Sequence, residues 1–197
     1  AASMGLEIPA MRSNNDDLVE RRLQRMGVPA TAAKTLATSV QRLLPRNPNS
    51  MSDCHQALAV ALDAAAYPMQ AIASRDPTSA EALAARLGDW VNPMTPAEAV
   101  DASELVFLTV PDAEIAPLAA SLPWRADQVV VHCSGVLGLD VLGPATDAGV
   151  VAGCFHPLQT FPSRDPEPWR FEDVACGIEG ADPLSATLEL LASDLGA

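Results

Sequence analysis

Short apolar segments without charge, separated by stretches that have helical spacing, constrain the fold of this chain most strongly. Four of them span residues 69–73, 105–110, 128–132 and 150–155. Uncharged, valine-rich segments that alternate with helices are typical of a parallel sheet covered on both faces. The pattern therefore predicts an α/β fold with a doubly wound, mostly parallel sheet.

Helical spacing fills the intervals between these segments, most clearly over residues 53–66, 76–88 and 183–195. Shorter helices are expected near residues 96–100, 115–118 and 139–142, and residues 174–178 are a further strand candidate. No internal repeat interrupts this alternation. The same architecture therefore accounts for the chain from about residue 49 to its end.

The first 48 residues have a different pattern, which predicts a helical hairpin and a linker. Asn15 or Asp16 can cap a first helix that ends at Gly27, and Pro29 begins a second helix. The apolar faces of the two helices comprise Val19, Leu23 and Met26, and Leu36, Val40 and Leu43. We therefore expect a hairpin extension over residues 1–48 and a nucleotide-binding domain over residues 49–197.

The charge distribution excludes some classes of partner. The net charge is −13, and residues 51–197 hold five basic against twenty-one acidic residues. So acidic a domain repels a phosphate backbone, which argues against nucleic acid as a partner. No run of eighteen apolar residues suggests a membrane span, and no leader is visible at the start given. Four widely spaced cysteines without a C-x-x-C pair favour buried thiols in a reducing compartment, so we expect a cytoplasmic protein.

Polar side chains follow the predicted strands where each one ends. Open parallel sheets bind ligands at the carboxyl edge of their strands, so these residues are the candidates for a site that takes a small-molecule substrate. They are Ser74 and Arg75; Val110, Pro111 and Asp112; His132 and Ser134; and His156, Gln159 and Thr160.

The pair Ser74 and Arg75 suggests the cofactor. NAD enzymes place an acidic residue at this position to bind the ribose 2′-hydroxyl, whereas a hydroxyl and an arginine suit the 2′-phosphate of NADP. The alternative is a surface turn with an incidental arginine and a helix cap.

His132 and His156 end two successive strands and are candidates for the acid/base group. A histidine there can exchange a proton with a substrate oxygen near neutral pH, and Ser134, Gln159 and Thr160 could orient that substrate. The alternative is a pair of histidines satisfied by loop carbonyls. Cys154 could complete a metal site with them, but the spacing matches no known zinc motif, so we expect no metal.

The glycine-rich turn of a dinucleotide-binding fold is missing from its expected place. Glycines in the turn after the first strand let backbone N–H groups approach the pyrophosphate. Counting back from Ser74, that turn falls on residues 50–55, SMSDCH, which hold no glycine. Ser52 is the remaining candidate for a cofactor contact there.

Residues 56–197 resemble the Rossmann-like oxidoreductases with a helical C-terminal domain of unknown function. These belong to the superfamily of pyrroline-carboxylate reductase, 6-phosphogluconate dehydrogenase and prephenate dehydrogenase. The matching text is IASRDPTSAEALAARLG, LVFLTVPDAEIAPLA, VVHCSGVLGLDVL and GCFHPLQTFP.

The resemblance implies an NADP-binding domain followed by a helical domain that forms a homodimer and completes the active site. It places Ser74 and Arg75 at the 2′-phosphate, residues 110–112 beside the nicotinamide ribose, and His156 near a reacting hydroxyl. Two departures, the glycine-free turn and the end of the chain at LLASDLGA, suggest a fragment or a degenerate enzyme. An NADP-dependent oxidoreductase domain acting on a small carbonyl or hydroxy compound, a non-catalytic binding or assembly module, and a flavodoxin-like or sugar-nucleotide domain all stay open.

Overall fold

The computed structural model describes residues 36–39, 51–159 and 171–197 of the chain. Its elements, in chain order, are β1 (Leu36–Ser39), α2 (Met51–Ala64), β2 (Met69–Ala73), α3 (Pro77–Leu87), β3 (Asn92–Met94), α4 (Pro96–Asp101), β4 (Leu105–Leu108), α5 (Asp112–Ser121), β5 (Val129–His132), the 3-10 helix η2 (Leu139–Leu142), α6 (Gly143–Thr146), β6 (Val151–Pro157), β7 (Cys176–Gly180) and α7 (Leu184–Asp194).

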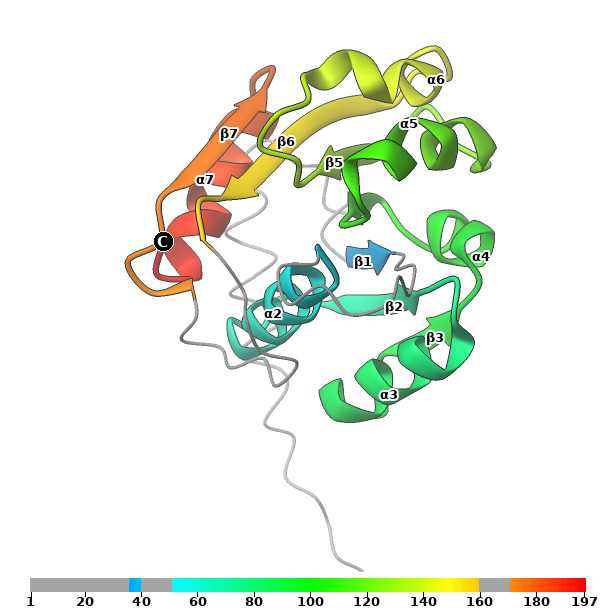
Figure 1. The fold of residues 1–197 in the computed structure, drawn as a ribbon, viewed down its shortest axis with the longest axis vertical. Coiled ribbons are helices and arrows are strands. Elements are labelled where there is room, and N and C mark those ends of the chain that lie inside the picture. The colour runs from blue at the N-terminus through cyan, green and yellow to red at the C-terminus, as the bar shows by residue number, and fades with distance from the viewer. Residues whose placement is uncertain (1–35, 40–50, 160–170) are drawn as a thin grey trace, which may run out of the picture.

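Among these residues, seven strands form one sheet in the order β3-β2-β1-β4-β5-β6-β7 (Figure 1). β1 to β6 run parallel, and β7 pairs antiparallel with β6 at one edge. From β1 the chain builds the sheet outward through β2 to β3, then crosses back to β4 on the other side of β1 and continues outward to β6, which defines a doubly wound fold. The α/β fold with a doubly wound, mostly parallel sheet is therefore confirmed.

Side chains of the strands alternate between two hydrophobic cores, as the pleat of a strand requires. Phe107, Val131 and Phe155 pack with residues of α2, α3 and α7 on one face. Val106, Leu108 and Val130 pack with residues of α4, α5, η2 and α6 on the other. Because each strand supplies apolar side chains to both faces, charge is excluded from the central strands.

Local sequence signals explain where the helices near the sheet edge begin and end. Asp76 caps α3 by accepting a hydrogen bond from the Thr78 amide, Pro77 occupies the first turn, and Gly88 ends the helix at φ 111°. Thr95 and Glu98 form a capping box at the start of α4. These caps fix the segments that follow β2 and β3.

The strand β1 corrects one prediction. We expected a helix from Pro29 through Leu36 and Leu43, but Leu36–Ser39 form a strand paired with β2 on one side and β4 on the other. Two neighbouring strands supply hydrogen bonds along both edges of this segment, which outweighs a weak helical spacing. The rest of the expected hairpin lies outside the described residues, and the domain boundary at residues 48 and 49 stays a prediction.

Two smaller differences have local causes. β3 was not predicted, because it has only three residues and contains Pro93, which is tolerated on an edge strand. The turn was expected at residues 50–55 and the helix from residue 53, but α2 begins at Met51, so Ser52 lies within the first turn of this helix. The connection between β1 and α2 is therefore residues 40–50, which lie outside the described residues and contain no glycine in the sequence.

No helix in the described ranges has both the length and the apolar character needed to cross a bilayer.

Candidate functional site

The predicted site residues that the structure describes, apart from Ser52, lie along the carboxyl edge of the parallel strands. β2, β1, β4, β5 and β6 are consecutive neighbours in the sheet, so their carboxyl ends meet at this edge. Ser74 and Arg75 follow β2, Val110 follows β4, Ser134 follows β5, and His156 lies near the end of β6. The edge divides into a cavity beside β2 and a histidine cluster beside β5 and β6.

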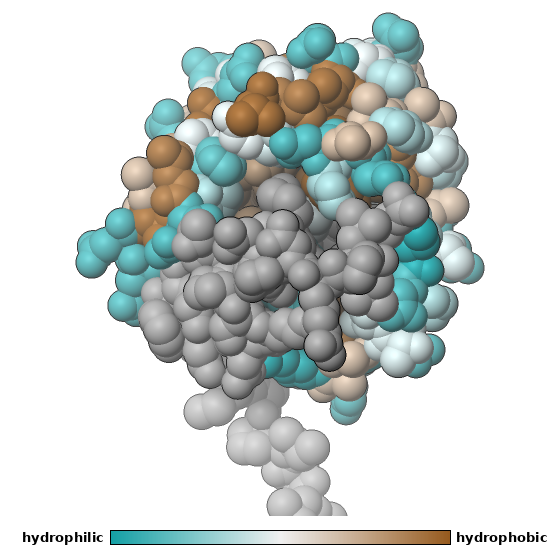
Figure 2. All heavy atoms as spheres, viewed as in Figure 1, coloured by the Kyte–Doolittle hydropathy of each residue, from teal (hydrophilic) through white to brown (hydrophobic). Residues whose placement is uncertain are grey.

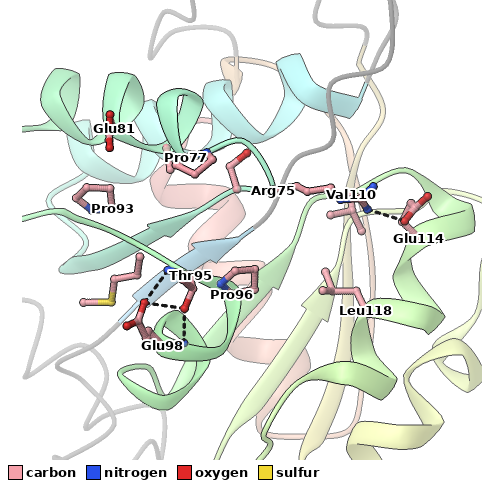
Figure 3. Close-up of a pocket in the computed structure, with 13 residues that line it drawn as sticks. Arg75, Pro77, Glu81, Pro93, Thr95, Pro96, Glu98, Val110, Glu114 and Leu118 are labelled. Atoms are coloured by element: carbon pink, nitrogen blue, oxygen red, sulfur yellow. Dashed lines mark hydrogen bonds and ion pairs between the residues drawn. The ribbon is translucent and has the colours of Figure 1, made fainter.

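A cavity of about 550 Å³ opens between the carboxyl ends of β2, β3 and β4 (Figure 3). Its walls come from the start of α3, from β3 and the start of α4, and from Val110 and α5. Ser74, Arg75 and Val110 of the predicted cofactor residues line it, whereas Pro111, Asp112, His132 and His156 are not among its lining residues. The lining residues are Ser74, Arg75, Pro77, Ala80, Glu81, Pro93, Met94, Thr95, Pro96, Glu98, Val110, Glu114 and Leu118.

Arg75 is the basic residue among the described residues that line this cavity, and it is paired with Glu114. Its Nη2 donates to Oε2 of Glu114 at 2.8 Å, and the two side chains are 50% and 28% exposed. Figure 3 shows the Arg75 side chain extending from the segment after β2 toward Glu114 of α5. Such a half-exposed ion pair is worth at most about 1 kcal/mol, so a ligand phosphate can compete for the arginine.

The other charged side chains among the described lining residues are acidic. They are Glu81, Glu98 and Glu114. Hydrogen bonds from the Thr95 side chain and backbone lower the pKa of Glu98, which therefore stays ionised. The described lining accordingly suits a mostly apolar or uncharged group, with Arg75 as a point of attachment for an anion.

Ser74 is 8% exposed, and its Oγ accepts a hydrogen bond from the Asp76 amide at 3.2 Å. Asp76 in turn caps α3 through Thr78 and accepts from the Ser79 hydroxyl at 2.8 Å. Ser74 thus supports the turn that leads into α3, and Asp76 is the residue that caps the helix. Arg75, by contrast, projects from the turn into the cavity.

The segment after β4 presents an apolar wall. Val110 is buried and lines the cavity, and Pro111 is the residue that precedes α5. Asp112 and Glu114 lie in the first turn of α5, where acidic side chains are favourable. Glu114, which sequence reasoning missed, could have been found from its place three residues into the helix after β4.

His132 lies inside the protein. Its side chain is 0% exposed, and its Nδ1 accepts a hydrogen bond from the Ser134 amide at 3.2 Å. Burial lowers the pKa of His132, opposed by the Gly138 backbone and by acidic side chains nearby. An accepting Nδ1 and a lowered pKa both indicate a neutral ring that is protonated at Nε2.

Ser134 organises the loop that follows β5. Its hydroxyl accepts hydrogen bonds from the amides of Val136 and Leu137, both at 3.2 Å, and its carbonyl accepts from Sγ of Cys154 at 3.4 Å. The side chain is 2% exposed. Its contacts are therefore with the protein's own loop, and in this conformation it is not presented to a substrate.

His156 is half-buried at the rim and differs from His132 in every contact. Its Nδ1 lies 3.0 Å from the carbonyl oxygen of Cys133. A carbonyl can only accept, so Nδ1 carries the proton and Nε2 holds the lone pair of the neutral ring. No other hydrogen bond to this ring involves the described residues.

The other predicted residues contribute less to the described site. Gln159 is exposed after β6, and its backbone N–H donates to the Pro157 carbonyl oxygen at 2.8 Å. Thr160 lies outside the described residues. Ser52 is placed in α2 by its backbone alone.

The cysteines are neutral thiols. Burial raises the pKa of Cys54 to about 12 and the pKa values of Cys154 and Cys176 to about 11. Burial also raises the pKa of Cys133 well above its usual range. Among the described residues no group of three His, Cys, Asp or Glu side chains is arranged to hold a metal ion.

Solved structures with the same fold include several oxidoreductases. A Bacteroides fragilis protein described as an NADP oxidoreductase is 22% identical, with a TM-score of 0.62 over 83% of this chain and 58% of that chain. A reductive aminase from Aspergillus terreus, solved with NADPH and ethyl-5-oxohexanoate, is 15% identical, with a TM-score of 0.61 over 83% and 54%. A prephenate dehydrogenase from Aquifex aeolicus is 15% identical, with a TM-score of 0.57 over 83% and 59%.

This chain thus spans little more than half of the length of each of these three proteins. No curated protein matches it. The structural likeness supports the predicted resemblance to this superfamily at the level of the fold. A family model of the Rossmann-like domain matches residues 49–157, which is more than half of the sequence. The chain belongs to the Rossmann-like domain family.

Proposed function

We propose that this chain is the dinucleotide-binding part of an NADP-dependent oxidoreductase that acts on a small carbonyl or hydroxy compound. The observation that supports the proposal best is the cavity after β2, where Arg75 faces the position that the ribose 2′-phosphate takes in such folds. The adenosine part of the cofactor suits the apolar lining, and Arg75 is the group that can bind the phosphate.

The second part of the proposal assigns proton transfer to His156. In the oxidation direction, Nε2 of His156 would take the proton of the substrate hydroxyl. NADP, when bound, would supply the acceptor for the hydride that leaves the carbon of that hydroxyl. In the reduction direction, the protonated ring returns the proton to the carbonyl oxygen. Because His132 is buried and engaged with Ser134, His156 is the better candidate of the two.

Calorimetric titration with NADPH and with NADH tests the cofactor assignment. We expect NADPH to bind more tightly, and Arg75→Ala to weaken NADPH binding about tenfold or more, because a hydrogen bond to a charged group is lost. NADH affinity should change less than about twofold, since that cofactor lacks the phosphate.

Arg86→Ala is the matched control, because it removes the same charge from the last turn of α3, outside the cavity lining. Equal losses in both variants would indicate a general field effect and count against a phosphate contact at Arg75. If neither cofactor binds at millimolar concentration, a non-catalytic binding module becomes the better proposal. The glycine-free connection at residues 40–50 is the feature that favours it.

A further inference from the structure

Gly135 lies against the imidazole ring of His156. A Cβ atom placed on Gly135 would be 2.6 Å from both Cδ2 and Cε1 of His156 and would also collide with Nε2. A Cβ atom does not approach non-bonded atoms this closely in folded proteins, so any side chain at this position requires the ring or the loop to move. Glycine is therefore needed here for close approach.

The contact is with the face of the ring. An atom that approached Nε2 in the plane of the ring would be much farther from Cδ2 and Cε1 than from Nε2. The Cβ position on Gly135 is only slightly nearer to Nε2 than to these two carbons, so it lies above the ring. Gly135 thus covers the ring from above. The in-plane direction of the Nε2 lone pair is left clear by this contact.

The other nitrogen of the ring, Nδ1, is held by a hydrogen bond. Nδ1 of His156 donates to the Cys133 carbonyl at 3.0 Å, two residues before Gly135. The same short loop therefore meets the ring at two places, at the Cys133 carbonyl oxygen and at Gly135, where no side chain fits. Together the contacts fix both the ring orientation and the nitrogen that carries the proton.

The backbone on both sides of this contact is held in place, so the imidazole ring is the part that must move. The loop is tied by the Ser134 amide to His132, by the Ser134 hydroxyl to two following amides, and by Cys154 to the Ser134 carbonyl. The backbone of His156 is paired with Gly177 of β7. A methyl group on Gly135 must therefore rotate the imidazole, which breaks its bond to Cys133.

We infer that Gly135 is a positioning residue for His156: its missing side chain lets the loop after β5 lie on the imidazole face and hold the ring with Nδ1 protonated and Nε2 as the proton acceptor. This inference rests on the proposed function only for the use of that base. The loop also borders apolar surface, because Val136 is 81% exposed and Figure 2 shows hydrophobic residues gathered over the segment between β5 and α6.

Nitrogen-15 NMR of the histidine rings tests the inference in the whole chain without a substrate. The signals of His156 are assigned by comparison with His156→Asn and followed above the pH at which the ring loses its proton. We expect the wild-type ring to be protonated mainly at Nδ1. Gly135→Ala should shift the ratio of the two neutral tautomers toward Nε2–H by about fivefold or more, the change that loss of one ordinary hydrogen bond produces.

Gly143→Ala is the matched control, since a Cβ there meets nothing within 4 Å and its φ is helical. It should leave the tautomer ratio unchanged. A wild-type ring protonated mainly at Nε2 would overturn the inference, even if Gly135→Ala fails to fold. An unchanged ratio in a folded Gly135→Ala protein would overturn it as well.

A parallel NADPH titration keeps this inference separate from the proposed function. Absence of NADPH binding by the wild type contradicts the oxidoreductase proposal and leaves the tautomer result to be judged on its own. NADPH binding together with a wrong tautomer contradicts the inference and leaves the cofactor proposal standing.

Discussion

The two halves of the sheet edge hold their polar groups in different ways. In the cavity half, beside β2 to β4, Arg75 is half-exposed and bound to one acidic side chain, Glu114, that a ligand can displace. In the histidine half, beside β5 and β6, His132 and Ser134 are buried and His156 is held by loop backbone. One half of the edge thus holds its charged group by a contact that can be exchanged, and the other holds its polar groups in fixed orientations, which is what the proposed function asks of binding and of proton transfer respectively.

The largest expected effect comes from the core that both halves share. Phe107 of β4 is fully buried and meets Phe155 of β6 edge to face, with ring centroids 6.2 Å apart. Phe107→Ala should lower the free energy of unfolding by about 3–5 kcal/mol, because it removes a large buried ring and leaves a cavity. Urea denaturation measures the loss.

The same denaturation experiment tests whether the cavity half and the histidine half unfold together. Trp90 follows α3 on the cavity side, and Trp124 lies between α5 and β5 on the other. In single-tryptophan variants, we expect both residues to report one coincident transition, in the wild type and in Phe107→Ala. Two separate transitions would show that the halves unfold as independent units.

A smaller effect is expected from pH in the histidine half. Burial lowers the pKa of His132 in the folded protein, so the unfolded chain binds more protons below about pH 6.5. The contribution of this group to stability is thus complete above about pH 6.5 and is lost as pH falls toward the folded pKa, by at most about 1.4 kcal/mol per pH unit.

Urea denaturation over a pH series, with His132→Gln as the reference, isolates this contribution from the titration of carboxylates. The difference between the two proteins should shrink or change sign as the pH decreases. If the difference in the free energy of unfolding between the two proteins stays constant from pH 7 to pH 5, the protonation of His132 does not contribute to the pH dependence of stability.

The smallest expected effect concerns the cavity half. Glu114→Gln removes the partner of Arg75 and one negative charge, so NADPH should bind about two- to fivefold more tightly, in line with the value of an exposed ion pair. Glu81→Gln is the control, because it removes the same charge from the cavity lining. If NADPH affinity rises equally in both variants, the overall negative charge of the cavity limits binding, and the release of Arg75 from Glu114 has no separate effect.

Much of the fold was predictable because its strands are marked by strong local signals. The segment 105–110 has no charge and few polar atoms, which is a requirement of a strand buried on both faces, and β4 lies there with Phe107 at its centre. β3 was missed because three residues with a proline have no periodicity to detect. β1 was missed because its pairing partners come from segments about 30 and 70 residues away along the chain, which no local pattern reveals.

The candidate site was predictable by position and less so by role. Placing polar residues after each strand identified Arg75 and His156, since the topology of a parallel sheet brings those positions to one edge. The same rule could not distinguish His132 from His156, because the residue type and the place in the strand are similar. Nor could it find Gly135 or Glu114, whose importance depends on contacts with residues 21 and 39 positions away.

By itself, the sequence determined the alternation of strands and helices, the acidic character of the body and the set of polar residues at the strand ends, because these properties depend on neighbouring residues and on composition. Only the tertiary structure decided which histidine is buried, which backbone carbonyl the His156 ring meets and which carboxylate meets Arg75. Those properties depend on distances between segments far apart in the chain, and side-chain packing across the sheet sets them.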